Sequence, residues 1–245
     1  MIQTLLRTSL TLTLLIFLWQ ATIFFCNLPV YILPTPQQVI TALWQQKTLL
    51  LTESLPTLLE TLLGLAFGIL LGCIAALILC FYRPLSKGFL PLLIISQAIP
   101  VFAIAPLLVI WLGYGLASKI ATTILILFFP ITSAFYDGLQ RTPAAWLDLA
   151  KTMQAKKWRL FWHIRIPAAL PALASGIRIA TVAAPMGAII GEWVGATHGL
   201  GYLMLNANAR MQIDVMFAAL IILVALSLAL YFCIDKLLRV LVTWE

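Results

Sequence analysis

Long apolar stretches, separated by short polar segments, run through most of the chain. Each is expected to form a membrane-spanning helix, because about 20 consecutive apolar residues cross the hydrocarbon core of a bilayer. The pattern predicts six such helices, over approximately 10–25, 58–82, 89–112, 120–135, 174–194 and 215–234. Between the first two, residues 35–44 have the pattern of a short amphipathic helix, with Thr35 as its cap and Pro36 at its first position.

Three glycines lie on one face of the second predicted span. Gly64, Gly68 and Gly72 are four residues apart, and small residues at this spacing let another helix approach closely. We therefore expect a close helix–helix contact along this face. The alternative is a flexible stretch without a partner.

The longest polar segment, residues 138–165, is expected to hold two short helices. Thr142 and Pro143 would begin the first, as its cap and first residue. Its apolar positions share one face: Trp146, Leu149, Ala150 and Met153. The second carries aromatic residues on one side, at Trp158, Phe161 and Trp162, and is expected to end before Pro167. The residues alone leave two interpretations open: a helix pair on the bilayer surface, or an apolar stripe offered to a partner's groove.

The composition agrees with a membrane protein. Of the 245 residues, 63% are apolar and 9% are charged, whereas soluble domains average roughly 45–50% and about 25%. A water-soluble globular protein and a disordered chain are therefore both excluded. We expect an all-α, polytopic membrane protein in which residues 1–245 form one transmembrane domain. The four cysteines form no CxxC pair, so neither a metal site nor a disulfide framework is predicted.

The net charge of +7 reflects basic residues that gather on one side of the predicted topology. That side holds Arg7, Arg83, Lys87, Arg141, Lys151, Lys156, Lys157, Arg159, Arg165, Lys236 and Arg239. Because positively charged loops stay in the cytoplasm, both termini and the polar loop are expected there. The basic charge therefore gives no reason to expect nucleic acid as a partner.

No motif of a catalytic or nucleotide-binding site is present. The chain lacks G-x-x-x-x-G-K-[ST], H-E-x-x-H and G-x-S-x-G. His163 and His198 fall on opposite sides of the predicted membrane, so they cannot form a dyad. We expect no catalytic and no metal-binding residues, and a protein other than an intramembrane enzyme.

Five residues within the predicted spans are candidates for a substrate pathway: Gln97, Pro100, Pro106, Glu192 and Trp193. Prolines inside a span free backbone carbonyls, which only protein or water can satisfy. Glu192 has two interpretations, a solvated carboxylate at the outer rim or a polar contact at an outer gate. Trp193 is typical of an interfacial aromatic, with substrate stacking as the alternative. Glu60 is expected to be exposed at the outer end of its span.

The polar loop resembles a known motif. Residues 148–150, Gln154, Ile164, Ile166 and Pro167 resemble the E-A-A-(x3)-G-(x9)-I-x-L-P loop of bacterial ABC importer permeases. In that family the loop is the coupling helix that sits in a cleft of the cytoplasmic ATPase. The resemblance implies ATPase coupling for seven residues: Asp148, Leu149, Ala150, Gln154, Ile164, Ile166 and Pro167. Asp148 stands where the motif has Glu, Leu149 where it has Ala, and Gln154 where it has Gly.

The resemblance extends along the chain. Residues 33–39 (LPTPQQV), the third span and residues 195–202 (GATHGLGY) resemble permeases for nitrate, taurine and sulfonates. Residues 135–139 (FYDGL), 191–195 (GEWVG) and 206–212 (NANARMQ) are similar to the branch assigned to thiamine-precursor pyrimidines.

This resemblance implies a type I ABC importer permease in the bacterial inner membrane, with a coupling loop at about 141–167. The expected partners are a second copy of the chain, a cytoplasmic ATPase dimer and a periplasmic or lipid-anchored binding protein. ATP would be bound by the ATPase, so no cofactor is expected in this chain. A sulfonate, taurine or nitrate permease is the alternative within the family. An ATP-independent channel or a membrane scaffold is the alternative from another class.

Overall fold

The computed structural model describes residues 2–243, except for the side chains of 2–6, 8, 9, 12, 83–87, 90, 92 and 94. Residues 2–243 contain helices and no β-strand. The helices are α1 (Ile2–Cys26), α2 (Pro36–Gln45), α3 (Lys47–Phe81), α4 (Arg83–Ala98), α5 (Val101–Leu112), α6 (Leu116–Gln140), α7 (Ala144–Thr152), α8 (Lys157–Leu160), the π-helical segment η1 (Phe161–Arg165), α9 (Ile166–Gly195), α10 (Leu200–Ala209) and α11 (Ile213–Leu241). The predicted all-α class is confirmed.

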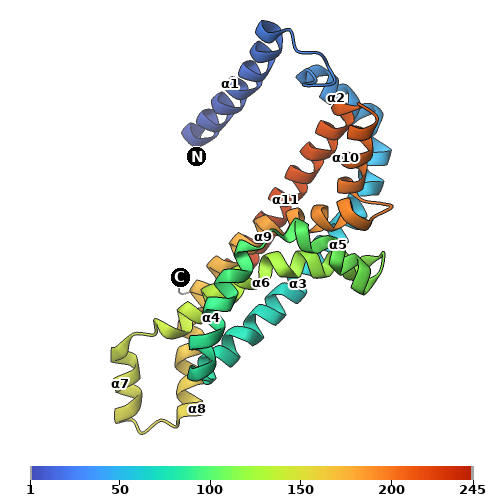
Figure 1. Cartoon of the computed structure of the whole chain (residues 1–245). Helices are drawn as coiled ribbons and strands as arrows, with labels where there is room; N and C mark the ends of the chain where they lie inside the picture. Colours follow the sequence, from blue (N-terminus) through green and yellow to red (C-terminus); the bar gives the residue numbers. More distant parts are fainter. Residues whose placement is uncertain (1, 244–245) are drawn as a thin grey trace.

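Helices α3, α6 and α9 pack together along the middle of the molecule, while α7 and α8 project from one end (Figure 1). The predicted glycine contact is confirmed: Gly64 faces Thr123 of α6, and a Cβ on Gly68 would lie 3.2 Å from Leu127. The α6–α9 contact is equally close, because a Cβ on Gly187 of α9 would meet the Cα of Thr123 at 2.7 Å. Small residues on α3 and α9 thus bring both backbones against α6.

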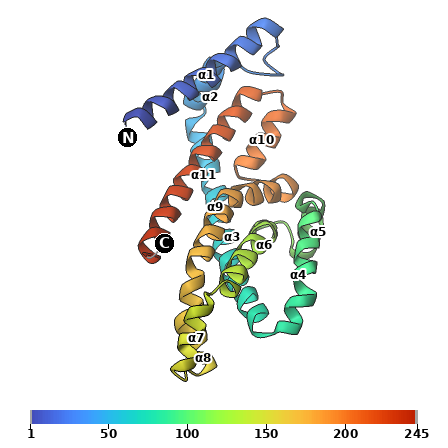
Figure 2. The same cartoon turned by 90° about the vertical axis from the view of Figure 1, so that its left-hand side faces the viewer.

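α4 and α5 lie on one side of this centre and α11 on the other, while α1 lies at the end opposite α7 and α8 (Figure 2). α2 begins with a capping box, in which Thr35 and Gln38 bond each other's backbone N–H groups, as the sequence predicts for Thr35. α2, α10 and α11 enclose an apolar cluster with the start of α3 and the C-terminal part of α9. α11 also pairs with α9 through Asp235, which accepts hydrogen bonds from Arg178 and Arg239 at 2.8 Å each.

Four helical stretches are long and apolar enough to cross a membrane, in the part of the chain that the structure describes. They are Lys47–Phe81, Leu116–Gln140, Lys157–Gly195 and Ile213–Leu241. The predicted first span lies in α1, whose apolar part Thr13–Cys26 is shorter. Two of the basic residues that support the predicted topology, Arg83 and Lys87, have side chains outside the described part of the structure.

The predicted third span, 89–112, is not one helix. It is broken into α4 and α5 at Ile99 and Pro100. Pro100 has no N–H to continue the helix, and its ring disfavours the helical conformation of the preceding residue. Ile99 accordingly has an extended backbone, with φ −83° and ψ 119°.

Two expectations for the polar loop are wrong. Thr142 does not cap α7, because its hydroxyl donates to the carbonyl of Leu139 at 3.2 Å and Pro143 precedes the first helical residue. The helix that begins at Lys157 does not end before Pro167 but continues through η1 into α9. Pro167 lies in the first turn of α9, where the missing N–H is tolerated next to the wider π turn.

Candidate functional site

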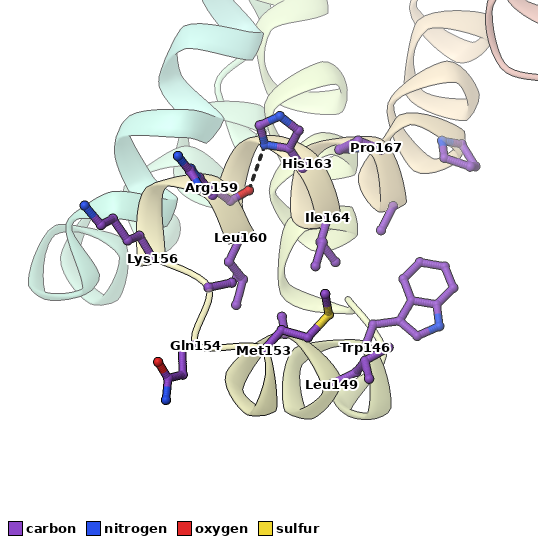
Figure 3. A pocket seen from close by; sticks show the side chains of 14 residues that line it. Trp146, Leu149, Met153, Gln154, Lys156, Arg159, Leu160, His163, Ile164 and Pro167 are labelled. Atoms are coloured by element: carbon purple, nitrogen blue, oxygen red, sulfur yellow. Dashed lines mark hydrogen bonds between the residues drawn. The ribbon is translucent and has the colours of Figure 1, made fainter.

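A groove opens between α7 and the helical segment formed by α8 and η1 (Figure 3). Its volume is about 840 Å³. The predicted stripe lines one wall, since Trp146, Leu149, Ala150 and Met153 all border the groove. The opposite wall includes Leu160, His163, Ile164 and Pro167, with Lys156 and Arg159 beside them.

The apolar wall of α7 is largely uncovered. The side chains of Leu149 and Met153 are 62% and 74% exposed, and Trp146 is 52% exposed. Among the described residues none fills the groove between these side chains and α8. A contiguous exposed apolar patch of this kind indicates a contact surface for another molecule.

A cluster of aromatic side chains packs the α8–η1 wall of the groove against the end of α3. Phe81, the last residue of α3, lies 4.3 Å from the ring centre of Phe161 and stacks on Trp158 at 6.1 Å. Trp162 packs against Trp158 at 5.4 Å. Large aromatic contacts of this type resist separation, so the start of the α8–η1–α9 segment is attached to the end of α3.

The turn that joins the two walls depends on Gln154. Its φ is +52°, a left-handed conformation that side chains rarely adopt. The N–H of Gln154 donates to Lys151 and the N–H of Ala155 donates to Ala150, at 2.9 and 3.0 Å. This is the Schellman arrangement that ends a helix, in which the left-handed position is usually glycine. Gln154 therefore keeps the turn that the motif's glycine would form.

The seven residues singled out by the loop motif divide between the groove and its surroundings. Five line it: Leu149, Ala150, Gln154, Ile164 and Pro167. Asp148 points away and pairs with Lys151 at 2.8 Å, with both side chains exposed. Ile166 is half-buried and packs toward Phe161 and Phe135 inside the helical body.

The five pathway candidates do not gather at one place. Gln97, Pro100 and Pro106 are exposed on α4 and α5 and on the joint between them. Trp193 is 40% exposed and meets Phe102 of α5 edge-on, with ring centres 6.4 Å apart. Glu192, its neighbour in sequence, is buried among α3 and α10, and both residues line a small cavity at the end of α9.

The prediction that Glu60 is exposed is wrong. Its side chain is 2% exposed, and its Oε1 accepts a hydrogen bond from the Nζ of Lys119 at 2.6 Å. Lys119 is itself buried at the start of α6. The ion pair joins α3 to α6, because each buried charge needs the other in a low-dielectric interior. Oε2 of Glu60 has no hydrogen-bond donor among the described residues.

Glu192 is not a solvated rim carboxylate. It is 1% exposed, and its two oxygens accept hydrogen bonds from the hydroxyl of Thr57 at 2.6 Å and the N–H of Gly201 at 2.5 Å. Thr57 also accepts the N–H of Leu200 at 2.8 Å, and Glu53 accepts the N–H of Gly199 at 2.5 Å. Side chains from α3 and α9 thus accept hydrogen bonds from the first N–H groups of α10. The N-cap residue of α10, Gly199, has no side chain that could accept them.

Reasoning from the sequence missed Lys119, Thr57 and Glu53 as parts of this polar cluster. A signal was present, because Glu60 and Lys119 both adjoin or lie within predicted spans. Ionisable groups there usually face protein and pair with one another. The hydroxyl of Thr57 gave no comparable signal, since threonine is common on apolar helices.

Comparison with known proteins places the whole fold among transport proteins. Residues 68–244 match the sequence model of a family described as "binding-protein-dependent transport system inner membrane component". A "probable ABC transporter permease protein" of Haemophilus influenzae is 57% identical over 235 residues, which cover 96% of each chain.

Two further relatives are named for their cargo. The formylaminopyrimidine transport permease protein ThiX of Halalkalibacterium halodurans is 37% identical, over 98% of this chain and 96% of its own. The riboflavin transport system permease protein RibX of Chloroflexus aurantiacus is 36% identical, over 96% and 88%. Among solved structures, an inward-facing MetNI methionine ABC transporter chain matches with a TM-score of 0.70 at 22% identity, over 80% of this chain and 97% of that chain. This structural likeness shows a shared fold.

Proposed function

We propose that this chain, which belongs to the family of binding-protein-dependent transport system inner membrane components, carries a thiamine-precursor pyrimidine as the permease subunit of an ABC importer. The observation that supports this cargo is the similarity to ThiX, which extends over nearly the full length of both chains. The motifs at 135–139, 191–195 and 206–212 point to the same branch.

In the proposed importer, the ATPase that drives transport would bind at the groove between α7 and α8. In this proposal α7 is the coupling helix, and the exposed side chains of Leu149 and Met153 fill a cleft in a cytoplasmic ATPase. Motion of the ATPase would reach α3 through the contacts of Phe81 with Trp158 and Phe161. It would reach α9 directly, because the helix is continuous from Lys157.

The remaining partners follow from the same proposal. A second copy of the chain completes the pore, an ATPase dimer binds ATP below it, and a periplasmic or lipid-anchored binding protein delivers the cargo. The termini and the α7–α8 loop lie in the cytoplasm, as the basic residues favour. The seven motif residues act in coupling, and transport proceeds by rocking of helix bundles.

The test is uptake of labelled hydroxymethylpyrimidine and formylaminopyrimidine in cells with the gene deleted and then restored. We expect uptake to fall on deletion, to return on restoration, and to stop when ATP is depleted. Uptake that survives ATP depletion would instead support a channel, and absence of any flux in reconstituted vesicles would support a scaffold.

The same cells test the competing cargoes. Riboflavin is included because RibX is nearly as similar as ThiX. Taurine, other sulfonates and nitrate are included because residues 33–39 and 195–202 resemble their permeases. If restoration recovers uptake of one of these and not of the pyrimidines, the pyrimidine assignment is wrong and the importer role stands.

A further inference from the structure

A second cavity, of about 390 Å³, lies where the end of α9 meets the start of α6 and the side of α10. It is separate from the groove at α7, with which it shares no lining residue. Its size falls in the range of sites for small molecules. Glu192 and Leu205 line it, and its four largest side chains are those of Tyr114, Lys119, Trp193 and Tyr202.

Three of these four side chains are aromatic, and they come from three parts of the chain. Tyr114 precedes α6, Trp193 lies in the last turn of α9, and Tyr202 lies in the first turn of α10. The position of Trp193 is supported from outside the cavity by its edge-on contact with Phe102. Tyrosine and tryptophan rings around one small cavity favour a flat aromatic ligand, which stacks on them.

The polar groups of the cavity comprise both donors and acceptors, and they include Glu192, whose two carboxylate oxygens already accept hydrogen bonds. Lys119 is 8% exposed, and its ammonium group donates to Glu60, which leaves two further hydrogens on Nζ. The carbonyls of residues 193–195 end α9, and among the described residues no backbone N–H bonds them. These carbonyls carry the negative end of the helix dipole, so they favour N–H donors and disfavour anions.

We infer that this cavity binds a neutral, single-ring aromatic heterocycle that bears an amino group. The ring stacks on Trp193 and Tyr202, a ring nitrogen accepts from Lys119, and the amino group donates to the carbonyls at the end of α9. A sulfonate is disfavoured, because its negative charge would face those carbonyls and because Lys119 is already paired with Glu60. Riboflavin bears no amino group on its ring system, so it lacks the amino donor that the carbonyls at the end of α9 would bind. This inference rests on the proposed import of an aminopyrimidine and assigns the binding of that cargo to specific residues.

The test is direct binding to the purified permease–ATPase complex in lipid nanodiscs, measured by equilibrium dialysis with labelled formylaminopyrimidine. We expect saturable binding that unlabelled aminopyrimidines displace and that taurine and riboflavin do not. Trp193→Leu and Tyr202→Ala should each weaken binding about tenfold, the usual effect of losing one stacked ring. Trp44→Leu is the matched control, because Trp44 is an exposed tryptophan on α2, outside the cavity.

The outcomes separate this inference from the proposed function. If cells import the pyrimidine and both cavity variants bind it as the unmodified protein does, the inference is wrong and the proposed function stands. If aminopyrimidines bind and both variants weaken that binding while cells import none of them, the site stands and the proposed cargo does not. Absence of any displaceable aminopyrimidine binding would overturn the inference.

Discussion

The hydroxyl of Thr57 on α3 donates to the carboxylate of Glu192 on α9 across 2.6 Å, and the same oxygen accepts the N–H of Leu200 on α10. One buried side chain thus joins three helices. Thr57 is 135 positions from Glu192 and 143 from Leu200, and each hydrogen bond satisfies a group that water cannot reach.

Replacing Thr57 should loosen this junction. Thr57→Val keeps the shape but removes the donor to Oε1 of Glu192 and the acceptor of the N–H of Leu200, which should cost about 2–3 kcal/mol of folding free energy. Thr57→Ser retains the hydroxyl and should lose much less. Thermal unfolding of the detergent-purified variants measures the difference. Equal destabilisation by valine and serine would mean that the hydroxyl contributes little.

Glu60 and Lys119 should behave as a coupled pair. Lys119→Met leaves a buried carboxylate unpaired, and Glu60→Leu leaves a buried ammonium group unpaired, so each should cost about 3–5 kcal/mol. The double variant should be much less destabilised than the sum of the two. A double-mutant cycle on unfolding free energies checks this, and strict additivity would contradict the coupling.

The close approach of α6 and α9 should not accept a larger residue at Gly187. A Cβ there meets the backbone of Thr123, which cannot move away as a flexible side chain could. Gly187→Ala should therefore lower stability by about 1–3 kcal/mol. The matched control is Gly88→Ala on α4, where a Cβ has open space within 4 Å and should be neutral or slightly stabilising. Similar unfolding temperatures for both variants would refute the packing argument.

Gln154→Gly should stabilise the end of α7. Glycine adopts a positive φ without the penalty that a Cβ brings, so we expect a local gain of about 1 kcal/mol. Gln154→Ala keeps the penalty and should bring no such gain. Hydrogen exchange of the amides of 153–155 is the measurement, and slower exchange in the glycine variant alone is the expected result.

The exposed stripe of α7 should govern ATP-driven uptake. Leu149→Glu and Met153→Glu place a charge on the apolar wall and should abolish co-purification of the ATPase and the uptake that depends on it. Lys151→Gln is the control on the same helix, since its exposed ion pair with Asp148 contributes only about 0.2–1 kcal/mol. Uptake that persists in both glutamate variants would exclude α7 as the coupling element.

Local patterns predicted several parts of this structure correctly. The capping box at Thr35, the glycine face of α3 and the apolar stripe of α7 each depend on residues a few positions apart, which the sequence places directly. Pro100 is also a local signal for the break, but the length and hydropathy of 89–112 favour a continuous span.

The buried polar cluster was beyond this kind of reasoning. Glu60 and Lys119 are 59 positions apart, and Thr57 and Glu192 are 135 apart. Whether a carboxylate near the end of a span faces water or a lysine depends on how three helices rotate against one another. Hydropathy along a single helix does not specify that rotation. The π turn before α9 was missed for a related reason, since Pro167 is compatible with either a helix end or a first helical turn.

The unbroken helix from Lys157 to Gly195 forms an arm that connects the groove beside α7 with the cavity beside α10. At 1.5 Å per residue, its 39 residues form an arm of about 58 Å. One end carries the wall of the α7 groove, and the other carries Glu192 and the wall of the cavity at Trp193. α6 lies along most of this arm, from Gly138 beside Ala169 to Lys119 beside Gly191. In the proposed mechanism a displacement at the groove would therefore move α9 together with α6 and reach the cavity. The π turn at Phe161–Arg165 lies beside the groove and interrupts the regular α-helical hydrogen bonding of the arm there. A substitution that restores α-helical winding at this turn would rotate the groove wall relative to the cavity wall at the other end of the arm.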